Sequence, residues 1–218
     1  RIVHVSSLSA AGPSPVPSGL GPDCEPAPVS WYGRSKLAAE RELREGAGSA
    51  RWTIVRPPAI YGPRDSDIFE FFRMAARGLV VLPAGERWLT VAWVGDVVRA
   101  TVAASAAPPA STYHLGEPEP VRLEELVRTL AAAGGVRARI AHLPPAVVRM
   151  AGWSGSALQR LGVRRLPLTA DKGRELLARH WTARTADSLA ALGLVGTLPF
   201  REGAARTWSW YRARGWLG

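Results

Sequence analysis

The sequence predicts an α/β protein with a parallel β-sheet, and three observations support this prediction. Two short runs rich in β-branched residues, 2–5 and 52–55, have the composition of buried parallel strands. A long helix-forming stretch, 31–45, lies between them. Strand-like and helix-like segments continue to alternate along the 218 residues, without a visible internal repeat. This alternation is typical of parallel strands joined by helical connections.

The segments around the long helix have clear boundaries. The Pro-, Gly- and Ser-rich stretch 12–28 is expected to be a loop. Ser30 is a suitable N-cap for the helix, and Gly46 and Gly48 are expected to end it. The second strand-like run stops at two prolines, which cannot continue a central strand.

The second half of the chain predicts shorter elements. Asp96 is expected to be the N-cap of one of the helices. The sequence shows no clear linker, so this half is expected to form a lobe rather than an independent module. The expected helices are 67–77, 97–106, 122–133, 144–161 and 202–216, and the expected strands and apolar stretches are 79–82, 88–94 and 113–115.

The composition favours a globular protein. Apolar residues make up 47% of the chain and charged residues 21%. No run of roughly 18 apolar residues predicts a membrane span, and the first residues have neither the basic region nor the long apolar core of a signal peptide. The single cysteine, Cys24, cannot form an internal disulfide, and its neighbours do not suggest metal ligands. We therefore expect a cytoplasmic protein without a metal site.

The formal charge of +10 raises the question of a nucleic-acid partner. Two of the 28 basic residues are lysines, Lys36 and Lys172, which leaves 26 arginines, and these are scattered along the chain. Such usage fits a GC-rich coding bias and a solvated arginine surface better than a nucleic-acid site. The Arg- and Trp-rich segment 206–216 could stack bases. An amphipathic helix whose arginine stems cover apolar surface is the simpler expectation.

The motif Tyr32-Gly33-Arg34-Ser35-Lys36 carries the clearest chemical signal. On a helix, Tyr32 and Lys36 share a face because they are four residues apart. An ammonium near a phenol favours the phenolate, so such a pair can exchange a proton with a carbinol or carbonyl oxygen. The spacing alone is common. The choice of Lys in a chain that otherwise uses Arg almost every time strengthens the signal.

Two further motifs lie where strands are expected to end. Ser6 and Ser7 follow the first strand, at the edge of an open α/β sheet where ligands bind. A serine pair can equally satisfy the backbone of a turn, which is its more common role. Pro57 and Pro58 follow the second strand and are expected to stiffen its exit, which by itself indicates only a structural turn.

Taken together, the motifs V-H-V-S-S, Y-G-R-S-K-L-A-A-E and V-R-P-P-A-I-Y-G-P resemble the extended short-chain dehydrogenase/reductases. The resemblance is close over residues 3–106 and looser beyond. It implies the C-terminal part of a Rossmann-like, doubly wound parallel sheet plus a small, mostly helical substrate lobe. Residues 1–62 would be the remaining part of the dinucleotide-binding and catalytic domain. Residues 63–218 would be a substrate-binding lobe interleaved with the last Rossmann elements.

The resemblance implies a Ser-Tyr-Lys catalytic set and NAD or NADP as the cofactor. Tyr32 would be the acid/base, while Lys36 would hold the nicotinamide ribose and favour the ionised phenol. Ser7 would hydrogen-bond the reacting oxygen of the substrate. Ser6 is the weaker candidate for that role and a candidate cofactor contact.

The same resemblance assigns the strand exit and the lobe. Pro57 and Pro58 would line the nicotinamide pocket, and the next three residues would turn toward the substrate. Asp96 would cap a helix of the lobe and would not be a catalyst. The helix at 31–45 corresponds to one that relatives use for dimer contacts, so a homodimer is possible. The three substrate-facing residues are Ala59, Ile60 and Tyr61.

The sequence departs from the family at the front. Members open with strand–G-x-x-G-x-x-G–helix, which binds the pyrophosphate, whereas five residues precede Ser6 here. The resemblance therefore implies an N-terminally truncated member, short by about 100 residues, the size of a mononucleotide-binding half. Such a chain is expected to expose a sheet edge, to aggregate, and to bind dinucleotide weakly.

The substrate stays open between a nucleotide sugar and a sterol-like or other apolar carbonyl compound. Sugar-nucleotide members place an Arg that meets a phosphate where this chain has Leu89, with Arg87 two residues earlier. The apolar segment 147–161 is more like members that act on apolar carbonyls, although simple packing explains it equally well. Dehydrogenation, epimerisation and dehydration begin with the same Tyr-Lys chemistry. The alternative to an enzyme is a non-catalytic scaffold or binding protein derived from this fold.

Overall fold

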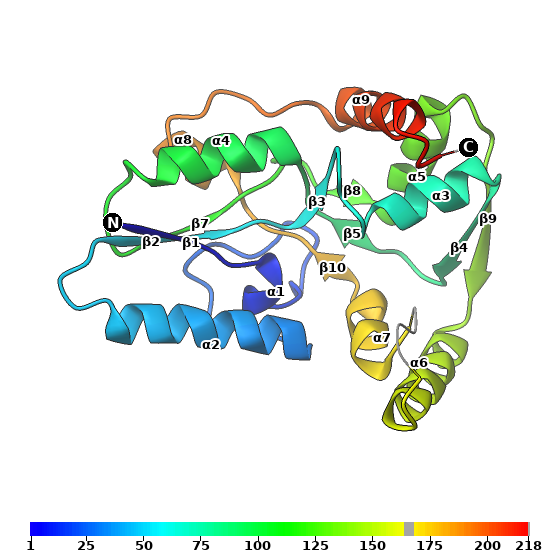
Figure 1. Ribbon diagram of the computed structural model, residues 1–218, viewed down its shortest axis with the longest axis horizontal. Helices are drawn as coiled ribbons and strands as arrows, with labels where there is room; N and C mark the ends of the chain where they lie inside the picture. Colours follow the sequence, from blue (N-terminus) through cyan, green and yellow to red (C-terminus); the bar gives the residue numbers. More distant parts are fainter. Residues whose placement is uncertain (164–167, 218) are drawn as a thin grey trace.

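The computed structural model describes residues 1–163 and 168–217, and it contains a three-stranded parallel sheet. Its order is β1-β2-β7, with Val3 opposite Thr53 and Thr53 opposite Ser111. Helix α2 covers one face of this sheet and helix α4 covers the other (Figure 1). The predicted α/β fold with helices on both faces is therefore confirmed. The bounds are β1 (Ile2–Val5), β2 (Trp52–Arg56), β7 (Ser111–His114), α2 (Trp31–Gly46) and α4 (Val94–Ala104).

Burial differs between the two strands that the sequence predicts to be buried. In β2, Thr53, Ile54 and Val55 are fully buried between the flanking helices. In β1, Ile2 and Val5 remain exposed by 41% and 43%. The prediction of a buried first strand is therefore wrong for this chain. β1 is the terminal strand of the described sheet, so its outer edge has no neighbouring strand there.

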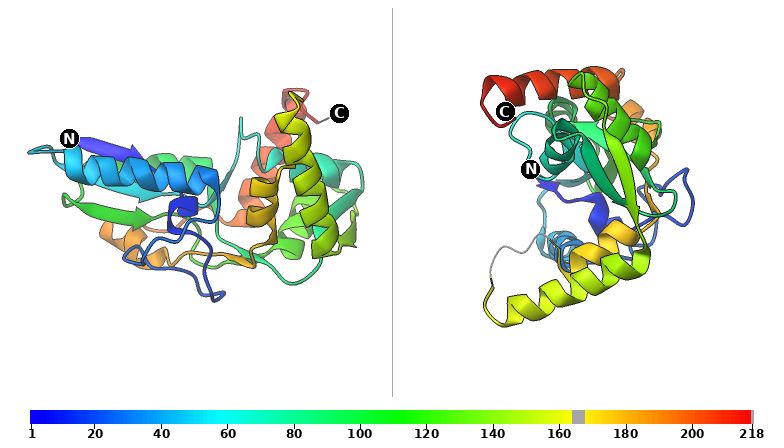
Figure 2. Two further views of the ribbon diagram at one scale, coloured as in Figure 1. Left: turned by 90° about the horizontal axis from the view of Figure 1, so that it is seen from below. Right: turned by 90° about the vertical axis from the view of Figure 1, so that its right-hand side faces the viewer.

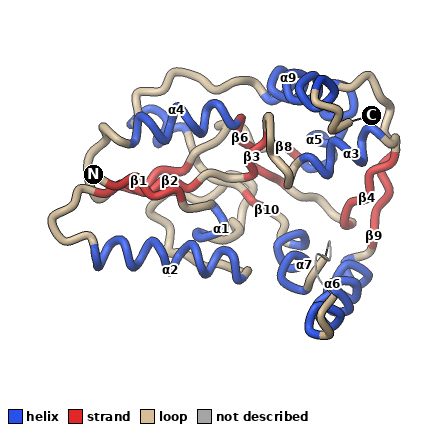
Figure 3. The backbone as a smooth tube through the Cα atoms, in the orientation of Figure 1, coloured by secondary structure: helices blue, strands red, loops and turns tan. Residues whose placement is uncertain are grey.

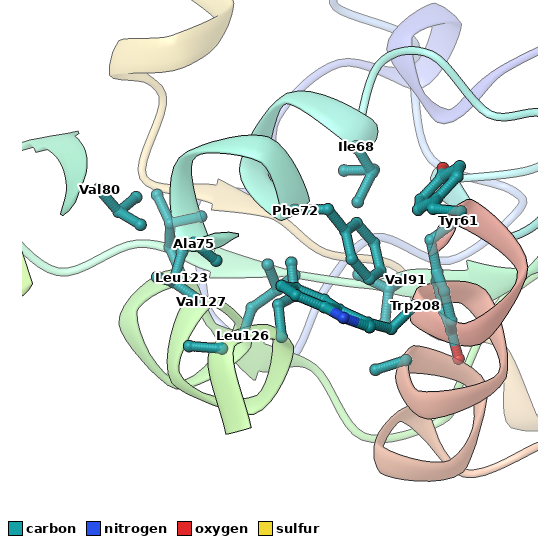
Figure 4. Close-up of a cluster of buried hydrophobic side chains, with 14 of the residues drawn as sticks. Tyr61, Ile68, Phe72, Ala75, Val80, Val91, Leu123, Leu126, Val127 and Trp208 are labelled. Atoms are coloured by element: carbon teal, nitrogen blue, oxygen red, sulfur yellow. The ribbon is translucent and has the colours of Figure 1, made fainter. Parts of the chain in front are cut away.

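The second half of the chain forms a lobe with its own hydrophobic core (Figure 4). Helices α3, α5 and α9 pack around strands β3 and β6. Phe72, Leu126 and Leu130 are fully buried among them, and Trp208 of α9 closes the cluster. The lobe is not separate in sequence, because α4 and β7 return to the three-stranded sheet. The bounds are α3 (Phe69–Ala76), α5 (Leu123–Ala133), α9 (Phe200–Ala213), β3 (Ala59–Tyr61) and β6 (Val91–Trp93).

The remaining elements are short, apart from the helix α6, and most were not expected from the sequence. The tube in Figure 3 shows β4 and β9 as a pair at one end of the molecule, beside the long helix α6. Over the described residues, no helix is both long and apolar enough to cross a membrane. The bounds are α1 (Leu8–Ala11), β4 (Leu79–Pro83), β5 (Trp88–Leu89), β8 (Val121–Arg122), β9 (Arg139–Leu143), α6 (Pro145–Arg160), α7 (Ala170–Leu177), β10 (His180–Trp181) and α8 (Ala186–Ala191).

Asp96 has a structural role, but not the predicted one. Helix α4 begins at Val94, so Asp96 lies inside its first turn rather than at the N-cap. Its carboxylate accepts a hydrogen bond from the backbone N–H of Leu198, at 2.7 Å, and pairs with Arg99. Asp96 therefore fastens the segment before α9 to α4. The prediction that it caps its own helix is wrong.

Glu117 joins strand β3 to helix α9 at the margin of the lobe core. The Tyr61 hydroxyl donates to Glu117 Oε1 at 3.2 Å, and the Phe200 N–H donates to Glu117 Oε2 at 3.1 Å. Burial raises the pKa of Glu117 to about 7, although both hydrogen bonds favour the ionised form. The carboxyl group is therefore half protonated near neutral pH in the folded protein.

Replacing Glu117 with Gln is expected to change how stability depends on pH. Between about pH 4.5 and 7 the folded wild-type protein binds more protons than the unfolded chain, so this group makes stability fall as pH rises. Glutamine does not titrate, so the variant lacks this loss. As the pH rises over this range, the unfolding free energy of Glu117→Gln should therefore gain about 1–2 kcal/mol relative to that of wild type. Urea unfolding at pH 5 and pH 7.5 measures it. A pH-independent difference would contradict the assignment.

Candidate active site

The first turn of α2 presents Tyr32 at the surface of the molecule. Ser30 is fully buried, and its hydroxyl accepts a hydrogen bond from the Gly33 N–H at 3.0 Å, as the sequence predicts for the N-cap. Asp171 of α7 accepts a second hydrogen bond, from the Trp31 N–H, with distances of 3.0 and 3.1 Å to its two oxygens. A carboxylate at a helix N-terminus is stabilising. Two parts of the chain, 140 residues apart, therefore fix the turn that carries Tyr32.

Lys36 lies one turn further along the same face of α2. Its Nζ is 5.9 Å from the centre of the Tyr32 ring and donates to the carbonyl oxygen of Val5 at 3.1 Å. This hydrogen bond ties α2 to the carboxyl end of β1. Tyr32 is half-exposed, so its hydroxyl can reach a bound substrate. The structure thus brings the predicted Tyr-Lys pair to the predicted edge of the sheet.

The two serines after β1 have different environments. Ser7 is the N-cap of α1, where its Oγ accepts from the Ser9 N–H at 3.1 Å. Over the described residues its hydroxyl hydrogen has no protein acceptor, so it can be donated to a ligand oxygen. Ser6 is buried, and its hydroxyl donates to Glu40 Oε1 at 2.5 Å. That bond occupies the Ser6 donor, so the structure supports Ser7 and not Ser6 as a ligand contact.

Gly33 sets the distance between α1 and α2. A Cβ added at Gly33 would overlap the carbonyl oxygen of Ser9, so only glycine allows the two helices to approach this closely. Ser9 lies two residues after Ser7, and Gly33 lies next to Tyr32. The contact therefore brings the Ser7 turn against the turn that carries the candidate acid/base.

Gly33→Ala is expected to lower the free energy of unfolding by about 1–3 kcal/mol, the usual cost of overpacking. Gly46→Ala, at the other end of the same helix, is the matched control because a Cβ there meets open space. It is expected to be neutral or slightly stabilising, since glycine costs a helix about 0.5–1 kcal/mol relative to alanine. Urea unfolding compares the two. Equal effects would contradict the proposed close contact.

Glu40 forms a buried ionic network that the sequence analysis did not identify. Arg56 Nε donates to Glu40 Oε1 at 2.8 Å, and Arg56 Nη2 donates to Oε2 at 2.7 Å, a bidentate arrangement. Both side chains are almost completely buried. Burial opposes ionisation of Glu40, but hydrogen bonds from Arg56 and Ser6 outweigh it and keep its pKa below the usual value.

Helical spacing could have revealed Glu40. It lies four residues after Lys36 and eight after Tyr32, so the three residues follow one another along one side of the helix. Through Arg56 and Ser6 it fixes α2 to the ends of β2 and β1. Glu40 is therefore a positioning residue for the two side chains that precede it on the helix.

The two prolines after β2 lie beside the Ser7 turn. The carbonyl oxygen of Pro57 accepts from the Leu8 N–H at 2.8 Å, and Pro57 itself is buried. Pro58 is half-buried, next to Gly116, where an added Cβ would meet the proline ring at 2.9 Å. Both prolines thus lie at the edge of the sheet that carries Ser7. Their role in a nicotinamide pocket remains a prediction.

Of the three residues after the prolines, Tyr61 does not face the substrate side as predicted, whereas a substrate-facing role for Ala59 and Ile60 stays a prediction. Ala59 and Ile60 are half-buried in β3, packed against the two main core clusters. Tyr61 is fully buried, its ring contacts Trp93 and Phe200, and its hydroxyl is bonded to Glu117. Tyr61 therefore belongs to the lobe core, where no substrate reaches it. Burial raises its pKa well above the ordinary range, so it is not a candidate acid/base.

Arg87 is not available as a phosphate clamp. Its side chain is buried, and Nη1 donates to the carbonyl oxygens of Pro83, Ala84 and Gly85 at 2.8–3.0 Å. Nε donates to the carbonyl oxygen of Leu176. The guanidinium therefore closes a turn and binds α7.

Two hollows lie near α2. The larger, about 630 Å³, is lined by polar and basic residues such as Arg41 and Arg44 and includes none of the candidate catalytic residues. The smaller, about 470 Å³, is mainly apolar and lies between α6 and α7. Its lining includes Val29, three residues before Tyr32 in the sequence, and none of the candidate catalytic residues. Its lining is Val29, Arg149, Trp153, Ala170, Gly173, Arg174, Leu177 and Ala178.

Comparison with known families gives a match over the first half of the chain. Residues 1–116 match the family described as the NAD dependent epimerase/dehydratase family. The matched part holds Ser7, Tyr32, Lys36 and the prolines after β2. A curated relative, a ceramide reductase of Caulobacter vibrioides, is 34% identical over the whole chain and 64% of its own length. The chain spans less than two thirds of each of the curated relatives it matches.

Solved structures share the fold. A UDP-glucose 4-epimerase of Thermotoga maritima has a TM-score of 0.75 at 20% identity, with 97% of this chain and 63% of that one covered. A UDP-glucuronic acid 4-epimerase of Bacillus cereus, solved with UDP-glucuronic acid and NAD, has a TM-score of 0.72 at 16% identity, with coverage of 97% and 61%. At these identities the likeness concerns the fold alone.

Proposed function

Because this chain belongs to the NAD dependent epimerase/dehydratase family, we propose that it carries the proton-transfer site of an NAD(P)-dependent oxidoreductase acting on a carbinol or carbonyl group. The observation that supports the proposal is the convergence of Tyr32, Lys36 and Ser7 at one edge of the parallel sheet. A bound nicotinamide dinucleotide supplies or accepts the hydride. All other steps are assigned to side chains of the chain itself.

In the direction of reduction, the Tyr32 hydroxyl gives its proton to the carbonyl oxygen, and in oxidation the phenolate takes it back. Ser7 donates a hydrogen bond to the same oxygen. Its Oγ accepts from the Ser9 N–H, and over the described residues its hydroxyl hydrogen has no protein acceptor, so that hydrogen can be donated to the substrate. Lys36 uses one N–H on Val5, which leaves two donors, over the described residues, for ribose hydroxyls.

NAD is the proposed cofactor, with NADP as the alternative. The family description supports NAD, as does its presence in the Bacillus cereus enzyme. The residue of this chain that fits a nicotinamide dinucleotide is Lys36, whose ammonium group is held at the edge of the sheet by its bond to Val5. The prolines after β2 are the proposed walls of the nicotinamide pocket.

The proposed substrate is an apolar carbonyl compound rather than a nucleotide sugar. The Arg87 guanidinium donates to backbone carbonyl oxygens, and the hollow that includes Val29, three residues before Tyr32, is lined mainly by apolar groups. The match to the ceramide reductase of Caulobacter vibrioides covers the whole of this chain and 64% of that protein. These observations favour a long-chain carbonyl compound. A nucleotide sugar remains the second candidate, because the epimerases that share the fold are solved with such substrates.

The test is an assay of NADH and NADPH oxidation by the whole protein that contains this chain. A long-chain 3-oxo amide is the lipid probe, and UDP-glucose with NAD is the sugar probe, followed by epimer analysis. We expect turnover of the lipid probe alone. Turnover of UDP-glucose alone would overturn the substrate class and keep the enzyme. Tight dinucleotide binding without turnover of either probe would support the non-catalytic scaffold.

A homodimer formed through α2 and a cytoplasmic location complete the proposal. Trp31 is 71% exposed on the first turn of α2, and Arg34 lies over its ring at 4.5 Å, a pairing suited to an interface. Sedimentation of the whole protein with and without Trp31→Ala tests the dimer. A monomer in both cases would reject it.

A further inference from the structure

Helix α6 lies at the periphery of the molecule, on the side opposite α9 (Figure 2). It packs against α7 through one narrow row of residues, Val148, Gly152 and Gly155. At both glycines an added Cβ would come too close to backbone carbonyl oxygens of residues 168 and 169. Most of the remaining α6 residues are exposed, which is unusual for a helix of this apolar content.

The exposed surface of α6 carries an apolar stripe. Val147 and Leu158 are eleven residues apart, as are Met150 and Leu161 just after the helix. Eleven residues make just over three turns of an α-helix, so the members of each pair lie on the same side. Val147 and Leu158 are each 44% exposed, Met150 is 65% exposed and Leu161 is 80% exposed. Hydrophobic side chains in such an alignment mark an interaction surface.

Basic residues flank this stripe. Arg149 and Arg160 are also eleven residues apart, so they lie along one side of α6, and Trp153 lies between them with 66% exposure. In the surrounding sequence, residues 126–170, there are seven arginines and no Asp or Glu. This part of the chain therefore carries positive charge without acidic residues to balance it.

We propose that α6 docks on the surface of a bilayer that contains anionic phospholipid. An apolar stripe, a Trp at its margin and arginines beside it are the features of a helix that lies in the headgroup region. The charge selects the partner, because the charged side chains of α6 itself, Arg149 and Arg160, are both basic and each can gain from an anionic surface. Docking would place the apolar hollow lined by Arg149 and Trp153 next to lipid.

The test is co-sedimentation of the full chain with vesicles of phosphatidylcholine alone or mixed with phosphatidylglycerol. We expect binding to the mixed vesicles, and a loss of affinity of about tenfold or more in Met150→Glu/Leu161→Glu. Val102→Glu is the matched control, since Val102 is 66% exposed on α4, and it should bind like wild type. Arg149→Gln/Arg160→Gln should weaken binding and its dependence on salt.

Circular dichroism confirms that each variant is folded before binding is compared. Absence of binding to mixed vesicles would overturn the proposal. So would equal binding by wild type and the stripe variant, which would indicate unspecific attraction to a basic protein. If wild type does not bind vesicles and the stripe variant differs from it in oligomeric state, α6 is a protein interface and the lipid proposal is rejected. None of these measurements depends on catalytic activity.

Discussion

Glu40→Ala is expected to lower the free energy of unfolding by about 3–5 kcal/mol, the range for breaking a buried ion pair by removing one partner. The substitution leaves the Arg56 guanidinium, which is 1% exposed, without its two carboxylate acceptors. It also leaves the Ser6 hydroxyl without its acceptor. The cost arises from the uncompensated charge more than from the lost packing.

Urea unfolding followed by circular dichroism measures this effect. Glu42→Ala is the matched control, because Glu42 is exposed on the same helix and its loss should change stability by less than about 0.5 kcal/mol. A double variant, Glu40→Ala/Arg56→Met, should recover part of the loss, since no unpaired charge remains buried. Equal stability of the Glu40 and Glu42 variants would show that the network does not hold α2 on the sheet.

Local signals in the sequence predicted the helix that carries the site. The capping Ser30 and the glycines after residue 45 define an element predicted as 31–45 and observed as Trp31–Gly46. Both signals act within one or two turns, so they do not depend on the rest of the fold. The edge of the sheet was predictable for the same reason, because strand ends are marked by the serines and prolines.

Interactions between distant residues were not predictable in this way. Asp171 binds the first turn of α2 from 140 residues away, and no local pattern near either residue indicates it. Tyr61 was expected to face the substrate because it follows the prolines, yet the cluster around Phe200 and Trp93 draws its ring into the core. The two-residue strands β5, β8 and β10 have too little sequence for a periodic signal, and only their pairing defines them.

Tyr32→Phe is expected to reduce kcat by about 10²–10⁴-fold in the assay of the whole protein, the usual contribution of a positioned general acid or base. The substitution removes only a hydroxyl from a half-exposed side chain, so the fold should be unaffected. The free energy of unfolding should change by less than about 0.5 kcal/mol. Lys36 and its bond to Val5 remain, so dinucleotide affinity should stay within about twofold, a change of about 0.4 kcal/mol.

Tyr113→Phe is the matched control, because Tyr113 is buried in β7 on the wall of the polar hollow that contains none of the candidate catalytic residues. It should retain kcat. Lys36→Met distinguishes the two roles assigned to the lysine, since it should weaken dinucleotide binding and lower kcat together, whereas Tyr32→Phe lowers kcat alone. A Tyr32→Phe protein that keeps more than about a tenth of wild-type kcat would remove Tyr32 from the acid/base role. Catalysis would then require another proton donor, and Ser7, whose hydroxyl is the remaining donor assigned to the substrate oxygen, would be the next residue to replace.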